Sequence, residues 1–188
     1  YLSMLGGIFS PISNLAMRLP SVKLLLEKLA GIDKRRPMPA FRHGSFLKAG
    51  RKYLASQGSI ENPTDKVAYF VDTYANYNDH ELGFAVLEVL RHNNIDVILP
   101  NQLPAPLPAI VYGDVSRAKK DLTYTVRHLA KAVREGYKIV CSEPSAALCL
   151  SQELRHFVAG EDAKLVSENT HELMDYLLDL HQQGKLKA

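Results

Sequence analysis

The sequence predicts an α/β fold: a Rossmann-like three-layer domain whose mostly parallel sheet has about four strands. Short apolar runs that fit buried strands, such as residues 67–71 and 95–99, alternate with longer segments of helical periodicity. Such alternation produces parallel βαβ units with right-handed crossovers. A basic, partly helical arm precedes the domain, and we place the boundary between an arm of residues 1–63 and a domain of residues 64–188.

The composition is that of a globular protein in water. Of the 188 residues, 46% are hydrophobic and 23% are charged, and no apolar run is long enough for a membrane span. Two cysteines are too few for a disulfide framework, so we expect a reducing, cytoplasmic setting. The chain begins at Tyr1 without an initiator methionine, from which we expect a processed product or a piece of a longer protein.

Positive charge is concentrated in the arm. Residues 1–60 contain ten Lys and Arg against two acidic residues, whereas residues 61–188 contain thirteen against eighteen. This asymmetry indicates contact with an acidic partner, or peripheral contact with anionic lipid at the inner face of the cell membrane. A solvated basic linker is the alternative. No nucleic-acid module accompanies the cations, so we expect no nucleic-acid partner.

Within the arm, one short helix is predicted from Ser21 to Leu29, with Gly31 as its stop. It follows an apolar stretch from Met4 to Phe9 that Pro11 interrupts. A helix of this length must dock on another segment. Between Asp33 and Pro63 we expect little regular structure, because prolines and basic residues punctuate the segment.

The domain opens with a strand over Val67–Val71. Asn78, with Glu81 three residues later, has the spacing of a capping box and predicts the start of a helix that ends near residues 92–94. Its inward residues are expected to be Leu82, Val86, Val89 and Leu90. The second strand covers Ile95–Leu99.

A proline loop from Gln102 to Asp114 follows the second strand. Its three prolines stand at every other position and argue against a helix interior or a sheet ladder. A long helix is predicted from about Val115 to Glu135, with Gly136 as its stop.

The last part of the chain completes the pattern. The third strand covers Tyr137–Cys141, and Pro144 suits the first turn of the next helix. Lys164–Val166 fits a short fourth strand. Thr170 is expected to cap a final helix that Gly184 closes.

Polar side chains follow the carboxyl ends of three predicted strands, where open α/β sheets bind ligands. The candidate pocket comprises Asp72, Thr73, Asn76, Tyr112, Glu143 and Ser145. The alternative is that these residues cap helices and fasten loops. Phosphate-loop, zinc-protease, dithiol and nucleophile-elbow motifs are absent from the sequence, so we assign no catalytic residue and no metal site. Cys141 is either a reactive thiol or a small buried hydrophobe, and Cys149 is expected in the core.

The same strand-end loops carry a resemblance to a known family. The matching segments are Tyr69–Tyr77 with Glu81-Leu82-Gly83, Leu107-Pro108-Ala109 with Gly113-Asp114, and Gly136–Val140 with Glu143-Pro144-Ser145. They resemble the cysteine-rich (CCG) domain of iron–sulfur oxidoreductases. That family includes subunits of anaerobic glycerol-3-phosphate dehydrogenase, of lactate and glycolate oxidases, and of heterodisulfide reductase.

The resemblance implies that cluster-ligand cysteines are missing here. At the family's ligand positions this chain has Thr73, then Pro104, Ala105 and Pro106, and then Ala146, none of which supplies a thiolate. It therefore implies a cluster-less domain without a cofactor of its own, acting as a structural or docking module for other domains or subunits of a flavin-linked redox complex. FAD and an iron–sulfur cluster would belong to those other parts. A small-molecule or catalytic pocket at the vacated site is the alternative.

Overall fold

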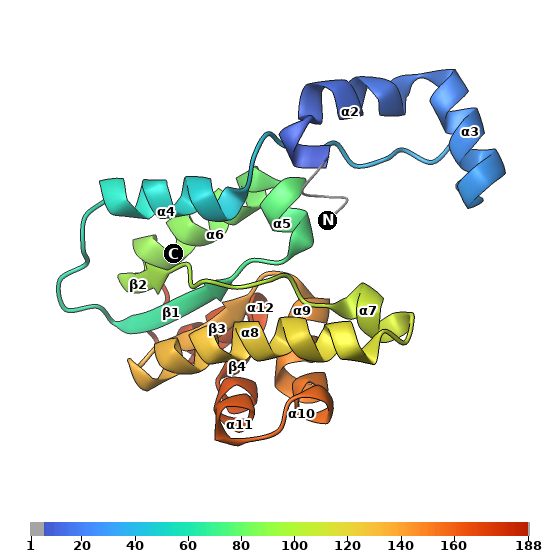
Figure 1. The fold of residues 1–188 in the computed structure, drawn as a ribbon. Coiled ribbons are helices and arrows are strands. Elements are labelled where there is room, and N and C mark those ends of the chain that lie inside the picture. Colours follow the sequence, from blue (N-terminus) through green and yellow to red (C-terminus); the bar gives the residue numbers. More distant parts are fainter. Residues whose placement is uncertain (1–5, 188) are drawn as a thin grey trace.

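A computed structural model describes residues 6–187 and confirms the α/β fold (Figure 1). Four parallel strands form one sheet in the order β2-β1-β3-β4. They are β1 (Asp65–Phe70), β2 (Ile95–Ile98), β3 (Lys138–Cys141) and β4 (Thr170–Glu172). The chain moves from β1 outward to β2 and then back across the sheet to β3. The boundary between β1 and β3 is therefore the topological switch point, where α/β sheets place their ligand sites.

Helices cover both faces of the sheet. One face carries α8 (Val115–Arg134), α9 (Pro144–Leu148), the π-helical segment η1 (Cys149–Glu153), α10 (Leu154–Phe157) and α11 (Glu161–Glu168). The other face carries α6 (His80–His92) and α12 (Leu173–Gln182), with α4 (Phe46–Ser56) packed on α6. Two short helices, α5 (Thr73–Tyr77) and α7 (Leu107–Val111), follow β1 and β2.

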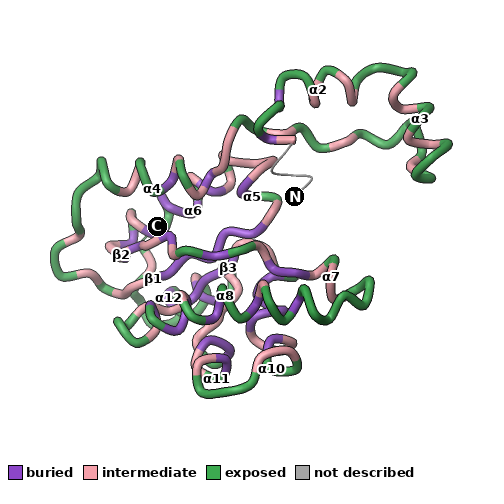
Figure 2. The backbone as a smooth tube through the Cα atoms, in the orientation of Figure 1, coloured by how far each residue is buried: buried purple, intermediate pink, exposed green. Residues whose placement is uncertain are grey.

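The two faces of the sheet bury separate apolar cores, because successive strand residues point to opposite sides. Tyr69 and Val140 belong to the core under α6 and α12, whereas Phe70, Ile139 and Cys141 belong to the core under α8. Figure 2 shows the buried residues concentrated on the strands and on the inner sides of these helices.

The expectation of little regular structure between Asp33 and Pro63 is wrong. Helix α4 occupies its second half, and the side chain of Phe46 is fully buried. The Phe46 ring makes edge contacts with Tyr69 and Phe84, with centroids 6.3 and 5.1 Å away. The sequence did not predict α4 because lysines and arginines on its outer side interrupt the apolar residues of its inner side. The division between residues 63 and 64 stays a prediction.

The arm also contains a helix before the predicted one. Helix α3 (Pro20–Ala30) confirms the predicted helix, and Gly31 ends it with a left-handed φ of 67°. Helix α2 (Ser10–Arg18) forms despite Pro11, because a proline in the first turn has no intrahelical hydrogen bond to lose. Met4 and Leu5 of the predicted apolar stretch lie outside the described residues. Figure 1 shows both arm helices standing away from the sheet.

Two boundaries near α6 and α7 differ from those predicted. Asp79, not Asn78, caps α6, and its carboxylate accepts a hydrogen bond of 3.0 Å from the backbone N–H of Leu82. Val89 is 42% exposed and not inward; Leu87 is buried instead. The proline loop contains α7, because Pro108 falls in the first turn of that helix.

The fourth strand also lies elsewhere than predicted. Lys164–Val166 lies inside α11, and the strand is Thr170–Glu172, whose Thr-His-Glu sequence has no apolar signal. Glu172, not Thr170, caps α12, with its carboxylate accepting from the backbone N–H of Met174 at 2.7 Å. By contrast, the long helix over Val115–Arg134 and its stop at Gly136 (φ 90°) are confirmed. Among residues 6–187, no helix is long and apolar enough to cross a membrane.

Phe46→Ala tests whether α4 belongs to the cooperatively folded unit. We expect a loss of about 3–5 kcal/mol in the free energy of unfolding, because a large buried ring is removed and leaves a cavity. Urea unfolding followed by circular dichroism measures the change. The matched control is Phe9→Ala on the arm, where the ring is 56% exposed, with an expected change below about 0.5 kcal/mol. Equal effects of the two substitutions would contradict the assignment of α4 to the folded unit.

Candidate functional site

The candidate site lies at the carboxyl ends of β1, β2 and β3. Three loops meet there: residues 71–79 after β1, residues 99–114 after β2 and residues 142–148 after β3. They meet because the strands are parallel and adjacent, so that all three loops emerge at one edge of the sheet. Several buried polar side chains lie in these loops and bond from one loop to another.

Asp72 links the loop after β1 to the loop after β2. It is only 5% exposed, and its Oδ1 accepts a hydrogen bond of 3.0 Å from the backbone N–H of Ala105. The hydroxyl of Thr73 also lies 3.4 Å from this oxygen. Burial raises the pKa of the Asp72 carboxyl above its ordinary value, although the hydrogen bonds to Thr73 and Ala105 oppose this change.

Gln102 makes a second link between the same two loops. Its Nε2 donates to the carbonyl of Val71 at 2.6 Å, and its Oε1 accepts from the Val71 N–H at 3.2 Å. Val71 lies one residue beyond the end of β1, where β2 no longer pairs with that strand. The side chain of Gln102 therefore satisfies the backbone groups of Val71 in place of a neighbouring strand. Sequence reasoning assigned no role to Gln102, because a pairing across 31 residues leaves no local signal.

Glu143 links the loop after β3 to the loop after β1. Its Oε1 accepts a hydrogen bond of 3.2 Å from the backbone N–H of Ala75 in the first turn of α5. A carboxylate from a loop 68 residues downstream thus caps α5, which has no local side-chain cap. Burial, followed by the nearby charge of Asp72, raises the pKa of Glu143. The two carboxyls therefore disfavour each other's ionisation.

Asn76 ties the site to α4. It is 3% exposed, and its Oδ1 accepts from the hydroxyl of Ser45 at 2.9 Å and from the backbone N–H of Leu47 at 3.1 Å. Those two groups stand at the start of α4, so Asn76 acts as a side-chain cap from another element. The sequence alone placed Asn76 at this edge but could not show that α4 is its partner.

The remaining pocket candidates lie apart from this buried network. Tyr112, which follows α7, is 88% exposed, and Ser145 in the first turn of α9 is also exposed. The structure thus brings together Asp72, Thr73 and Glu143, with Asn76 facing α4, and leaves Tyr112 and Ser145 at the surface.

None of the four positions that the resemblance predicts as former cluster ligands carries a thiol or a charged side chain. Thr73 and Pro104 are partly buried, whereas Ala105 and Ala146 are 5% and 0% exposed. Both alanines belong to the apolar core that contains Phe70 and Leu122. Across residues 6–187, no three His, Cys, Asp or Glu side chains are grouped so that they could hold a metal ion.

Both cysteines are fully buried free thiols next to this edge. Burial, followed by the charge of Asp72, raises the pKa of Cys141 well above its ordinary value. Burial, followed by the charge of Glu153, raises the pKa of Cys149 to about 12. A cysteine reacts as its thiolate, so the raised pKa values indicate that Cys141 and Cys149 are small buried hydrophobic side chains and not reactive thiols.

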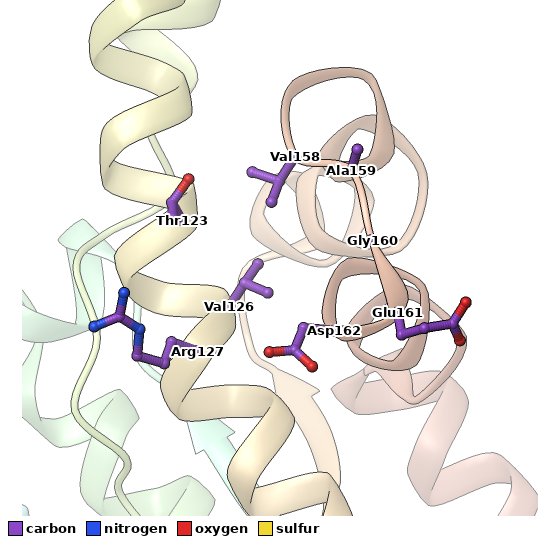
Figure 3. Close-up of a pocket in the computed structure, with 8 residues that line it drawn as sticks. All are labelled: Thr123, Val126, Arg127, Val158, Ala159, Gly160, Glu161 and Asp162. Atoms are coloured by element: carbon purple, nitrogen blue, oxygen red, sulfur yellow. The ribbon is translucent and has the colours of Figure 1, made fainter.

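Two hollows of the described surface are lined by other residues. One, of about 310 Å³, lies between α8 and the link from α10 to α11. Figure 3 shows Val126, Val158 and the carboxylate of Asp162 facing into it, while the guanidinium of Arg127 and the carboxylate of Glu161 point away. The other, of about 360 Å³, lies between α6 and the C-terminal segment, beside Leu177 and Leu186.

Comparison with known proteins shows a similarity to a dehydrogenase component. The chain is 29% identical over 147 residues to proteins named as a subunit of anaerobic glycerol-3-phosphate dehydrogenase, from Escherichia coli strain K12 and Escherichia coli O157:H7. The match covers 77% of this chain but only 36% of each relative, so the chain spans about a third of their length. No family model and no solved structure matches the chain. The similarity agrees with the oxidoreductase resemblance of the sequence and leaves the missing-cysteine interpretation as a prediction.

Substitution of Asp72 tests whether burial raises the pKa of its carboxyl in the folded chain. Because its pKa is raised in the folded chain, the folded state binds the proton more tightly than the unfolded state, and the wild type loses stability as pH rises above the ordinary value of 3.8. Asp72→Asn keeps the acceptor for Ala105 without the charge. We expect it to be more stable than wild type at pH 8, with a difference that shrinks toward pH 4.5. Urea unfolding at both pH values measures this.

Asp72→Ala is the control for the lost acceptor. It leaves the buried N–H of Ala105 without a partner and should cost about 1–3 kcal/mol. A pH-independent difference between Asp72→Asn and wild type would contradict the raised pKa.

Proposed function

We propose that this chain is a cluster-less CCG-type domain that serves as a structural or docking module in a flavin-linked, iron–sulfur-dependent redox complex. Its similarity to a glycerol-3-phosphate dehydrogenase subunit supports the setting. The parallel sheet and its three convergent loops support the proposed domain architecture. That complex would be a dehydrogenase that oxidises glycerol-3-phosphate, lactate or glycolate.

The observation that carries the proposal is the set of hydrogen bonds between the strand-end loops. In the family that the sequence resembles, a cluster joins these loops through cysteine sulfur. In this chain, Asp72 bonds to Ala105, Gln102 to Val71 and Glu143 to Ala75, so each loop is already joined to a neighbour. Loops cross-linked in this way can keep their positions without a bound cluster.

The donor chemistry at the edge does not fit an iron–sulfur cluster. Such clusters need thiolates, and the ligand positions hold Thr73, Pro104, Ala105 and Ala146. The two cysteines lie in the apolar core with pKa values raised by burial, which opposes their deprotonation as ligands. We therefore assign no step of electron transfer to this domain.

The same bonds favour a docking role over a small-molecule pocket. Asp72, Asn76 and Glu143 each accept from backbone or hydroxyl groups of this chain. A ligand would have to displace those bonds, leaving buried N–H groups unpaired at a cost of about 1–3 kcal/mol each.

The arm supplies a surface suited to docking. Helix α3 buries none of its residues, and Leu25 and Leu29 are 55% and 79% exposed. On α2, Ile12 and Leu15 are similarly exposed, at 70% and 63%. Exposed apolar surface of this extent is unfavourable in water and marks an interaction site.

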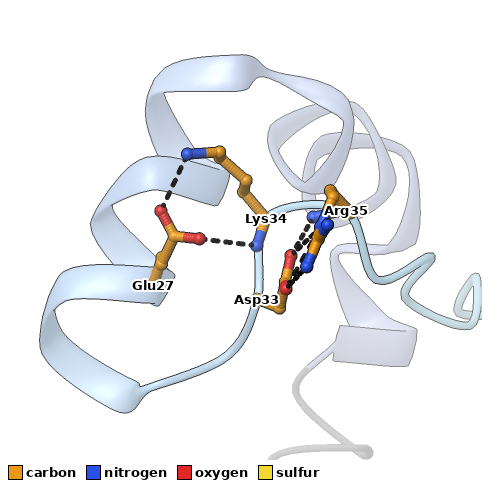
Figure 4. Close-up of polar contacts among 4 residues, drawn as sticks. All are labelled: Glu27, Asp33, Lys34 and Arg35. Carbon is orange, nitrogen blue, oxygen red and sulfur yellow. Dashed lines mark hydrogen bonds and ion pairs between the residues drawn. The ribbon is translucent and has the colours of Figure 1, made fainter.

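The charges of the arm specify an acidic partner. The two acids among residues 1–60 are neutralised by their own neighbours: Glu27 pairs with Lys34 at 3.2 Å and Asp33 with Arg35 at 2.6 Å (Figure 4). Other cations on and beside α2 and α3 therefore remain available to an external anion; they are Arg18, Lys23, Lys28 and Arg36. We propose an acidic face of another subunit as their partner, with anionic lipid as the competing occupant.

The double substitution Leu25→Glu and Leu29→Glu tests this role. Both side chains are exposed, so thermal unfolding should be unchanged, whereas recovery of flavin and iron–sulfur subunits with the tagged chain should fall at least about tenfold, because introduced acids oppose an acidic partner. The measurement is quantitative mass spectrometry of complexes purified from cells that naturally make the chain.

The matched control is Met174→Glu with Leu178→Glu on α12, at 65% and 51% exposure. Equal recovery of redox subunits with the arm variant and with the control would contradict the proposal. Loss of binding to phosphatidylglycerol vesicles without loss of subunits would assign the arm to lipid instead.

A further inference from the structure

The outward face of α8 combines exposed apolar and basic side chains. The α8 face consists of Val115, Lys119, Lys120, Tyr124 and Arg127, all exposed, and the exposed Tyr112 lies three residues before the helix begins. Val115 and Tyr124 are 57% and 44% exposed. On α8 itself, residues four positions apart share a side of the helix, so 115, 119, 123 and 127 form one row and 116, 120 and 124 form the next. This α8 face is therefore one continuous surface.

Its cations have no acidic partners among residues 6–187. Lys119, Lys120 and Arg127 form no ion pair there, whereas the other cations of α8 do: Arg117 lies 3.6 Å from Asp121, and Lys131 lies 3.9 Å from Glu135. Arg134 is paired with Asp162. The α8 face thus leaves three positive charges in solvent and contains no acid of its own.

A hollow adjoins the same face. It is the 310 Å³ hollow lined by Thr123, Val126 and Arg127 on one side and by residues 158–162 on the other, including the acids Glu161 and Asp162. Figure 3 shows Val126, Val158 and the Asp162 carboxylate toward its interior, whereas the Arg127 guanidinium points away from it. Asp162 is paired with Arg134. An apolar side chain of a partner could contact the two valines here, while its acidic groups meet Lys119, Lys120 and Arg127 on the outward side of α8, away from Asp162.

We propose that the α8 face is a second docking surface, for a protein segment that presents apolar side chains flanked by Asp or Glu. This inference rests on the proposed docking function and names a separate surface for it. The unpaired cations select an acidic partner, and Tyr124, Val115 and the hollow supply the apolar contact.

A second copy of this chain is the nearest competitor. Helix α12 exposes Met174 and Leu178 beside Asp175 and Asp179, so it has the complementary character. It packs on the opposite face of the sheet from α8, however, so contacts between copies would run head to tail. Such contacts do not close on themselves unless the rotation between copies happens to form a ring. A different protein is therefore the occupant that we infer.

Site-specific photocrosslinking in cells that naturally make the chain tests the inference. A benzoylphenylalanine replaces Tyr124 on the α8 face, Leu25 on the arm or Leu178 on α12, and crosslinked peptides are sequenced by mass spectrometry. We expect Tyr124 to crosslink to an acidic, apolar segment of another protein. The adduct should fall at least about tenfold with Lys119→Glu and Lys120→Glu, because like charges then face each other.

The control pair is Lys48→Glu with Lys52→Glu on α4, also exposed and four residues apart, which should leave the adduct unchanged. No adduct at Tyr124, or an adduct equally reduced by the control pair, would overturn the inference. So would an adduct to α12 of a second copy, to lipid or to nucleic acid. If Leu25 crosslinks to redox subunits while Tyr124 gives none, the proposed function stands and this inference fails.

Discussion

The structure depends on how the loops at the carboxyl edge satisfy their buried backbone groups. A buried N–H without a partner costs free energy comparable to a lost hydrogen bond. The N–H groups of Val71, Ala75 and Ala105 are satisfied by side chains from other loops, namely Gln102, Glu143 and Asp72. These bonds fix the start of α5 and the path of the proline loop into α7.

This arrangement carries an electrostatic cost. Burial raises the pKa of both Asp72 and Glu143, and the charge of Asp72 adds to the effect on Glu143. Two neighbouring carboxyls in an apolar setting do not maximise stability, and we propose that these two contribute more to a unique loop geometry than to the free energy of folding. If the edge binds no cluster, as we propose, these bonds are the means by which it keeps a defined shape, with Ala105 and Ala146 completing the core beneath it.

The sequence predicted the elements whose periodicity is strong and failed where the signal is weak or distant. The long helix over Val115–Arg134, its stop at Gly136 and three of the strands follow from apolar spacing. Helix α4 was missed because basic residues interrupt its apolar residues, and β4 because its three residues are polar. At the site, the convergence of Asp72 and Glu143 follows from parallel strand ends. The pairing of Asn76 with Ser45, 31 residues apart, does not, since only the folded chain brings them together.

Our central proposal is that hydrogen bonds, and not an iron–sulfur cluster, join the strand-end loops. The most direct measurement is the iron and acid-labile sulfide content of the anaerobically purified chain, read together with its visible absorption spectrum. We predict a colourless protein with less than about 0.1 iron per chain, because the ligand positions offer no thiolate. A brown protein that contains several irons and matching sulfide per chain would contradict this proposal.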